Sequence, residues 1–180
     1  MEKTRTFIAV DFPDEVVKEV ARVQGILRGR KFTGKLTELG NLHLTLKFLG
    51  EIDSETLNKV KKELGKIKIG KFEASLKEAG IFSYRKKPRI AWIKIGGKGM
   101  FDLQAAVDNA MEKCGFKKEE RFMSHLTLAR IKYVKSPDEF KEYVKNLKVG
   151  EIKFNVEEFK LMKSELREMG PVYETLKIYK

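Results

Sequence analysis

The sequence is poor in the residues that most often build redox and metal chemistry: it has one cysteine and two histidines among 180 residues. A single cysteine excludes an intramolecular disulfide and any zinc site that needs several cysteines. Cys114 falls on the apolar stripe of a predicted helix, so we expect a buried small side chain rather than a nucleophile. The longest aliphatic and aromatic runs, such as residues 7–10, are far too short to span a bilayer. The opening residues lack the apolar core of a signal peptide, and we therefore expect a cytoplasmic protein with no membrane partner.

Acidic residues are outnumbered: 38 Lys and Arg face 26 Asp and Glu, for a formal net charge of +12. An excess of this size favours polyanionic partners such as nucleic acids. The alternative is a solvated, salt-bridged surface, because abundant Lys and Glu with only two Gln residues are also typical of hyperthermophilic proteins. With 42% hydrophobic and 36% charged residues, the chain is expected to be globular rather than disordered.

One tetrapeptide, His-Leu-Thr-Leu, occurs twice, at residues 43–46 and 125–128, and the two histidines of the chain open the two copies. The match continues downstream, because each copy is followed by a short loop and a helical pattern with a similar apolar stripe. Each half of the chain reads as strand, helix, His strand, helix and strand. Such self-similarity indicates a duplicated unit with approximate two-fold symmetry.

We therefore predict an α+β fold in which two pseudo-symmetric lobes each have an antiparallel sheet with helices on its outer face. The two His strands would line a central cleft. Residues 1–180 would form a single domain, with lobes at about 1–85 and 86–180 that exchange strands. Strands are expected at about 4–11, 42–48, 71–80, 90–95, 122–130, 151–162 and 172–179, and helices at about 13–27, 54–64, 101–114 and 137–147. Residues 28–35 and 83–89 read as basic loops that each carry an aromatic residue.

Side chains alternate across a strand, which divides each tetrapeptide into a His-Thr face and a Leu face. In the first copy this places Lys47 on the face of His43 and Thr45, and Phe48 on the face of the leucines. In the second copy, strict alternation places Arg130 with the leucines, away from His125. Arg130 would reach the face of His125 either if the strand ends or bulges near Ala129, or if its long side chain reaches around the strand edge.

A histidine and a threonine two residues apart on one strand face suit a phosphate group. The hydroxyl can donate to a non-bridging oxygen, and the imidazole can exchange a proton with a bridging oxygen. Two such strands would supply a general base for water and a general acid for the leaving oxygen, with no metal required in principle. A zinc site would lack a third and fourth ligand. Ser124 would point to the opposite strand face, and no glycine-rich phosphate loop is present.

The two copies with their flanks, HLTLKFLGE and EERFMSHLTLAR, resemble the paired motifs of the two-histidine (2H) phosphoesterase superfamily. Within it the chain is similar to the RNA 2′,3′-cyclic phosphodiesterases, historically called 2′-5′ RNA ligases. The resemblance extends to RTFIAVDFP near the start, RIAWIKI in the middle and GPVYETLKIYK at the end, so it covers essentially the whole chain.

That resemblance implies an enzyme that opens a terminal 2′,3′-cyclic phosphate on RNA, leaves a 2′-phosphomonoester and uses no cofactor. His43 would be the proton donor to the departing 3′ oxygen, and His125 the proton acceptor that activates water. Thr45 and Thr127 would hold the phosphate oxygens, and Arg130 would add positive charge to the phosphate pocket. Partners would be RNA chains with such ends, tRNA fragments among them, and the protein would be a monomer.

Two alternatives stay open at the level of sequence. The same groups could run the reverse reaction, a 2′-5′ ligation in which a 5′-hydroxyl replaces water. The chain could also be an RNA-end or nucleotide-binding module without significant turnover. Lys47, Phe48 and Tyr84 are further candidates for RNA contact, against the alternatives of a solvated lysine, core packing and a solvated loop, respectively.

Overall fold

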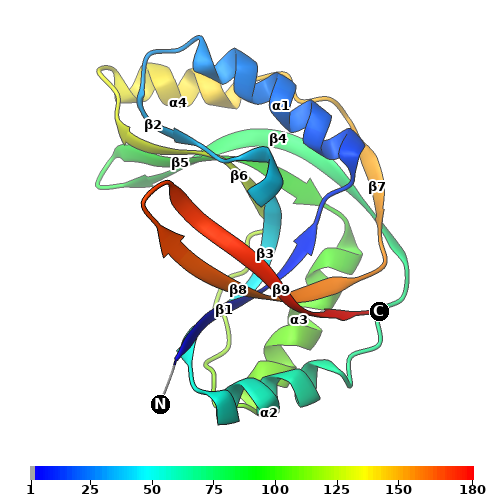
Figure 1. The fold of residues 1–180 in the computed structure, drawn as a ribbon. Helices are drawn as coiled ribbons and strands as arrows, with labels where there is room; N and C mark the ends of the chain where they lie inside the picture. The colour runs from blue at the N-terminus through cyan, green and yellow to red at the C-terminus, as the bar shows by residue number, and fades with distance from the viewer. Residues whose placement is uncertain (1–2) are drawn as a thin grey trace.

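Residues 3–180, which the computed structural model describes, form nine strands, four α-helices and one short 3-10 helix (Figure 1). The strands are β1 (Thr4–Asp11), β2 (Thr33–Leu36), β3 (His43–Ile52), β4 (Phe72–Tyr84), β5 (Lys87–Gly96), β6 (His125–Tyr133), β7 (Lys153–Val156), β8 (Phe159–Arg167) and β9 (Gly170–Tyr179). The helices are α1 (Asp14–Arg28), α2 (Ser54–Leu64), α3 (Lys98–Glu112) and α4 (Pro137–Lys145), with the 3-10 helix at Leu39–Asn41.

The strands form two antiparallel sheets, one in the order β3-β1-β8-β9 and the other in the order β2-β6-β5-β4-β7. We call them sheet A and sheet B. Neither sheet follows the order of the sequence, because β8 and β9 join the first His strand, whereas β2 and β4 join the second. Helices α1 and α4 pack on sheet B, while α3 packs on β3 and β4 and α2 packs on α3 (Figure 1). The predicted α+β fold of two antiparallel sheets covered by helices is confirmed, whereas the division into lobes near residue 85 stays a prediction.

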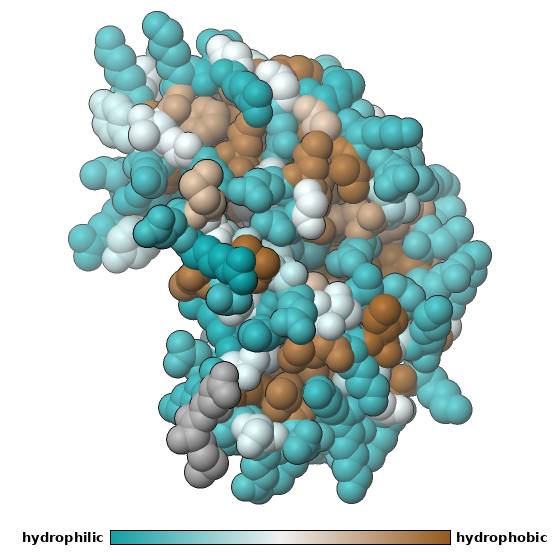
Figure 2. All heavy atoms as spheres, viewed as in Figure 1, coloured by the Kyte–Doolittle hydropathy of each residue, from teal (hydrophilic) through white to brown (hydrophobic). Residues whose placement is uncertain are grey.

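The helices form within three residues of the bounds that the apolar spacing predicts, and each buries most of its apolar stripe. In α1 the residues Val16, Val20, Val23 and Leu27 are all fully buried. Helix α2 is capped by Asp53, whose carboxylate accepts a 2.8 Å hydrogen bond from the Thr56 amide. Hydrophilic side chains cover most of the face seen in Figure 2. Among the described residues, no helix is long and apolar enough to cross a membrane.

Cys114 lies just beyond the end of α3 and is only partly buried against the core, so its prediction as a buried residue is right only in part. Burial raises the pKa of its thiol, which keeps the group in its less reactive neutral form.

The first His strand contains a β-bulge that the sequence pattern does not show. Leu46 has no partner in β1, because the register of the ladder shifts between Ile8 and Ala9. Leu46 and Lys47 therefore both face the core, at 1% and 4% exposure, and Phe48 turns outward at 64%. The predicted faces of Lys47 and Phe48 are consequently wrong, because strict alternation holds only as far as the bulge.

The second His strand has its bulge at the equivalent position. The register between β5 and β6 shifts between Ala91 and Trp92, which leaves Leu128 without a partner. Leu128 and Ala129 are both fully buried, and Arg130 is exposed on the face that carries His125. Of the two options that the sequence leaves for Arg130, a bulge near Ala129 is the one found.

The Lys47 side chain reaches through the core to the segment that leads into β6. Its ammonium forms an ion pair with the Asp108 carboxylate of α3 and donates a 2.7 Å hydrogen bond to the Lys117 carbonyl. Asp108 also accepts a 2.9 Å hydrogen bond from the Glu119 amide. Both partners of the pair are at least 92% buried, so β3, α3 and the following loop are tied together at one point.

The two segments predicted as basic loops both contain strand residues. In the first, Arg28 ends α1, residues 29–32 are a loop, and only residues 33–35 are strand. Residues 33–36 form β2, and residues 83–89 are the tip of the β4–β5 hairpin, whose turn is Arg85-Lys86. The absence of an Asn-Gly turn signal hid this hairpin in the sequence.

We predict that Asp108→Ala destabilises the protein by about 3–5 kcal/mol, because it leaves the buried Lys47 ammonium with only the half-exposed Glu119 carboxylate, 3.8 Å away. The double variant Lys47→Met/Asp108→Leu should recover most of this loss, since it removes both charges. Urea unfolding at constant m-value measures both changes. The matched control is Glu55→Ala, which breaks an exposed i,i+4 pair with Lys59 at 3.1 Å and should leave the midpoint nearly unchanged. Equal costs for Asp108→Ala and Glu55→Ala would contradict the role of the buried pair.

Candidate active site

A cleft with a volume of about 820 Å³ lies between sheets A and B. Both His strands line it, and β3 and β6 contact each other directly. Partly or fully exposed side chains that line it are His43, Thr45 and Phe48 from β3, and His125, Thr127 and Arg130 from β6. Gly50 and the buried Leu46 and Lys47 of β3 also border it. The structure thus brings together the residues that the repeated tetrapeptide singles out.

The same kind of hydrogen bond to the backbone orients the two histidines. His43 Nδ1 lies 2.8 Å from the Asn41 carbonyl, and His125 Nδ1 lies 2.7 Å from the Met123 carbonyl, in each case two residues earlier in the chain. A carbonyl oxygen only accepts hydrogen bonds, so Nδ1 of each ring carries the proton and donates it. Each Nε2 is therefore free to act as a base when the ring is neutral, or as an acid when the ring is charged.

Aromatic rings confine both imidazoles. The His43 ring centroid lies 4.9 Å from that of Phe7 and 5.1 Å from that of Tyr173, the latter edge-on. The His125 ring meets Phe82 edge-on at 5.0 Å. These contacts restrict ring rotation, so the hydrogen bond at Nδ1 and the direction of Nε2 are set before any ligand arrives.

Burial lowers the pKa of both histidines. For His43 the burial effect is opposed by the Asn41 hydrogen bond and the Asp11 carboxylate, and it is reinforced by positive charge on Arg130 and His125. For His125 the burial effect is opposed by the Met123 hydrogen bond. Since the charge of His125 acts on His43, protonation of both rings together is disfavoured.

The threonines are half-buried on the same cleft wall as the histidines. Each lies two residues beyond its histidine on the same strand face, which places a hydroxyl donor about 7 Å along the strand from each ring. Arg130 stands beyond the second bulge and brings a guanidinium to the same cleft. Two hydroxyls, two imidazoles and one cation suit a bound phosphate group.

The remaining sequence candidates are placed differently. On the sequence alone, Lys47 is a candidate for RNA contact. Its ammonium is instead buried in the ion pair with Asp108 and is not available to an RNA ligand. Phe48 lines the cleft at 64% exposure rather than packing in the core. Tyr84 is exposed at the end of β4, outside the set of residues that line the cleft.

Several cleft residues have no signal in the tetrapeptide. Arg5, Arg121 and Tyr173 line the cleft from β1, from the loop before β6 and from β9. Tyr173 belongs to the closing GPVYETLKIYK segment, and only the exchange of β9 into sheet A brings it to His43. Among residues 3–180, no three His, Cys, Asp or Glu side chains are grouped as metal ligands would be.

Comparison with known proteins adds relatives of similar length. A family model described as "LigT like Phosphoesterase" matches residues 10–92 and 96–173. The RNA 2′,3′-cyclic phosphodiesterase of Methanocaldococcus jannaschii is 32% identical over 176 residues, which cover 96% of this chain and 98% of the relative. The protein of the same name from Thermotoga maritima is 31% identical over 96% of this chain and 92% of its own length.

Solved structures share the fold. A crystal structure of a Thermus thermophilus protein superposes with a TM-score of 0.83 at 28% identity, covering 97% of this chain and 96% of that one. Escherichia coli LigT complexed with 3′-AMP superposes with a TM-score of 0.73 at 22% identity, covering 99% and 97% of the two chains, and shows the fold alone. With a family model that spans nearly all of its residues, this chain belongs to the LigT-like phosphoesterase family.

Proposed function

We propose that the protein hydrolyses the terminal 2′,3′-cyclic phosphate of RNA to a 2′-phosphomonoester by general acid–base catalysis, without a metal ion. The observation that carries this proposal is the pair of histidines in one cleft, each with Nδ1 tied to a carbonyl, a free Nε2 and a threonine on its strand face. The names of the relatives in Methanocaldococcus jannaschii and Thermotoga maritima point to the same substrate.

In the proposed reaction, neutral His125 takes a proton from water at Nε2 while the water oxygen forms a bond to phosphorus. The bond between phosphorus and the 3′ oxygen breaks, and protonated His43 delivers its Nε2 proton to that oxygen. The products are a 2′-phosphate and a free 3′-hydroxyl, and proton exchange with solvent resets the two rings. Thr45, Thr127 and Arg130 would stabilise the charge that develops on the non-bridging oxygens.

The surroundings of His43 act on its pKa in both directions, and burial, the largest cause, lowers it. Asp11, its cross-strand neighbour, raises the pKa of His43, which favours the protonated form required of a donor. Deeper burial and the charge of Arg130 act in the opposite direction.

Phe48 would contact a base of the RNA. It occupies in β3 the position that Arg130 occupies in β6, because each is the second residue beyond the bulge. A largely exposed phenyl ring beside a phosphate pocket suits stacking on a nucleobase. The same cleft would serve the reverse 2′-5′ ligation when a 5′-hydroxyl replaces water.

We expect His43→Ala and His125→Ala each to lower kcat about 10²–10⁴-fold on an RNA that ends in a 2′,3′-cyclic phosphate, because each removes one proton transfer. The assay follows loss of the cyclic end in excess EDTA, with and without an RNA that carries a 5′-hydroxyl. Lys62→Ala, an exposed change on α2, is the control. Activity that requires added Mg²⁺ or Zn²⁺ would contradict the mechanism. Tight binding of the RNA by the unaltered protein without turnover would instead identify an RNA-end-binding module.

A substrate with sulfur in place of the 3′ oxygen should separate the roles of the two histidines. A thiolate leaves without protonation, so His43→Ala should regain most of its lost rate on this substrate, whereas His125→Ala should not. Single-turnover rates on the oxygen and sulfur substrates measure the recovery. Rescue of His125→Ala alone would reverse the assignment of acid and base.

The pH dependence of kcat/KM should be bell-shaped with its optimum below the ordinary histidine pKa of about 6.5. Activity falls on the acid side when the base becomes protonated and on the alkaline side when the acid loses its proton. Burial lowers both pKa values, so both limbs move to lower pH. Asp11→Asn removes a carboxylate that raises the pKa of His43, so it should move the alkaline limb further down. A flat profile between pH 5 and 8 would rule out the histidine pair as acid and base.

A further inference from the structure

Nearly all of the positive excess of the chain is concentrated in three short segments. Residues 28–35, 83–89 and 125–135 contain eleven Lys or Arg residues and no Asp or Glu. In the rest of the chain, 27 Lys and Arg are balanced by 26 Asp and Glu. The net charge of +12 is therefore a local property of these segments rather than a general feature of the surface.

The fold gathers the three segments at one end of sheet B, where β2, β6, β5 and β4 are neighbours. Lys35 of β2 lies opposite Arg130 of β6, and Arg89 of β5 donates a 3.3 Å hydrogen bond to the Lys132 carbonyl of β6. We call this surface the basic corner. All eleven of its cations are exposed: Arg28, Arg30, Lys31, Lys35, Arg85, Lys86, Lys87, Arg89, Arg130, Lys132 and Lys135.

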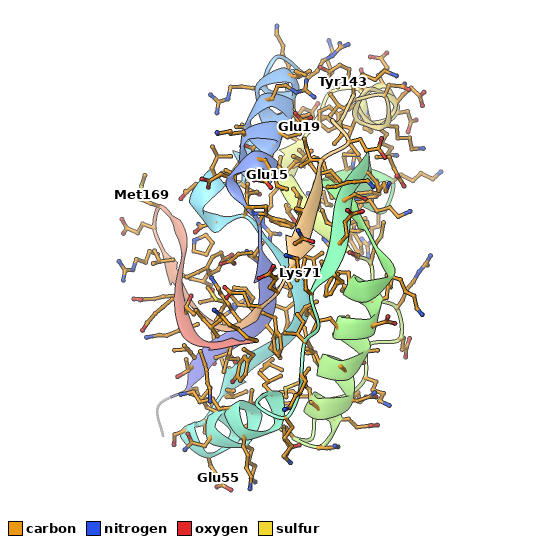
Figure 3. All side chains as sticks on the ribbon, turned by 90° about the vertical axis from the view of Figure 1, so that its right-hand side faces the viewer. Glu15, Glu19, Glu55, Lys71, Tyr143 and Met169 are labelled. Atoms are coloured by element: carbon orange, nitrogen blue, oxygen red, sulfur yellow. The ribbon has the colours of Figure 1, made fainter. Side chains whose placement is uncertain are left out.

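The basic corner is open to a ligand because its cations have few partners. Within residues 3–180, Lys35 is its one member in an ion pair, with Glu38 and at 2.8 Å. The corner is continuous with the cleft, since Arg130 and Lys35 belong to both. The β8–β9 hairpin, with Met169 at its tip in Figure 3, reaches the same place, where the Lys35 ammonium bonds the Met169 carbonyl.

The β4–β5 turn in this corner has an unfavourable sequence for its shape. Arg85 and Lys86 both adopt positive φ, at 47° and 65°, between the paired residues Tyr84 and Lys87. Such two-residue turns favour Asn and Gly, because other side chains are strained there. The turn nevertheless carries two cations, and the Arg85 guanidinium lies 5.2 Å from the ring centroid of the exposed Tyr84. Strained backbone clusters at ligand-binding positions, so the two charges of this turn are candidates for contact with a ligand.

We propose that the basic corner binds the sugar–phosphate backbone of an RNA strand upstream of its 3′ end. The substrate would then be an RNA chain of several nucleotides rather than a free cyclic nucleotide. This inference rests on the proposed function, because it takes the cleft as the site of the terminal phosphate. Cations contiguous with a phosphate pocket, together with an exposed tyrosine, match a single-stranded polyanion that has bases to stack.

The test replaces the turn with the sequence that its geometry favours, Arg85→Asn/Lys86→Gly. This variant should have a higher Tm than the unaltered protein, because it relieves strain. Its kcat/KM on a 12-nucleotide RNA with a 2′,3′-cyclic end should fall about 10-fold, while its kcat/KM on a cyclic mononucleotide should stay the same. The slope of log KM against log salt for the 12-mer should become shallower by about 1.4, since each lost phosphate contact removes about 0.7.

The matched control is Lys59→Gln/Lys62→Gln, which removes the same charge from α2 at the far end of the molecule (Figure 1). It should leave the preference for the 12-mer unchanged. Lys132→Gln, on β6, gives a second test of the basic corner that does not alter the turn. Equal losses for the turn variant and the control, or an unaltered protein that does not prefer the 12-mer, would overturn the inference.

Failure of the proposed function has a different signature. If neither the 12-mer nor the mononucleotide is hydrolysed by the unaltered protein, the catalytic proposal fails. Binding of a 12-mer with a 3′-phosphate, measured by fluorescence anisotropy across a salt series, then tests the basic corner alone. A weaker and less salt-dependent affinity in the turn variant would support the backbone contacts, and an unchanged affinity would contradict them.

Discussion

An extra residue in each His strand, Leu46 in β3 and Leu128 in β6, decides which side chains the cleft receives. Up to the bulge, alternation sends the leucines into the core and the histidine and threonine into the cleft. Beyond it the phase is reversed, so Phe48 and Arg130 join the cleft, and Lys47 and Ala129 join the core. Bulges of this kind redirect side chains next to functional sites. Without them, the cleft would lose its guanidinium and its exposed phenyl ring, and Lys47 would lose its buried partner.

The same bulges show how a duplicated motif becomes an unequal pair. The two tetrapeptides are identical, and their histidines are tied by identical backbone hydrogen bonds. The differences begin one residue later. Lys47 anchors Asp108 and the segment that leads into β6, whereas its counterpart Ala129 simply fills space. Phe48 offers an aromatic face to one side of the cleft, and Arg130 offers a charge to the other. The proposed acid–base reaction requires such asymmetry, because the acid and the base have different roles within one turnover.

Strand exchange connects the cleft between the sheets to the rest of the molecule. Sheet A takes β8 and β9 from the end of the chain, which brings Tyr173 against His43. Sheet B takes β2 and β4 from the first half, which gathers three basic segments beside Arg130. The cleft and the basic corner are thus produced by the same topology. Because the two are continuous, they favour a long polyanion whose end lies in the cleft and whose backbone lies along the basic corner.

The sequence by itself determined the paired His-x-Thr motif, the two-sheet α+β fold and the helices, because these depend on local spacing and on which residues are apolar. It also determined the size of the charge excess. Only the tertiary structure decided which strand face Lys47, Phe48 and Arg130 occupy. A bulge is a mismatch in the pairing of two strands, so the sequence of either strand alone does not show it. Likewise, the tautomer of each histidine depends on a backbone carbonyl whose direction is set by folding. The three basic segments form one positively charged patch only because β2, β4, β5 and β6 pair in sheet B. Charges that are distant in sequence add to one electrostatic potential only when folding brings them close in space.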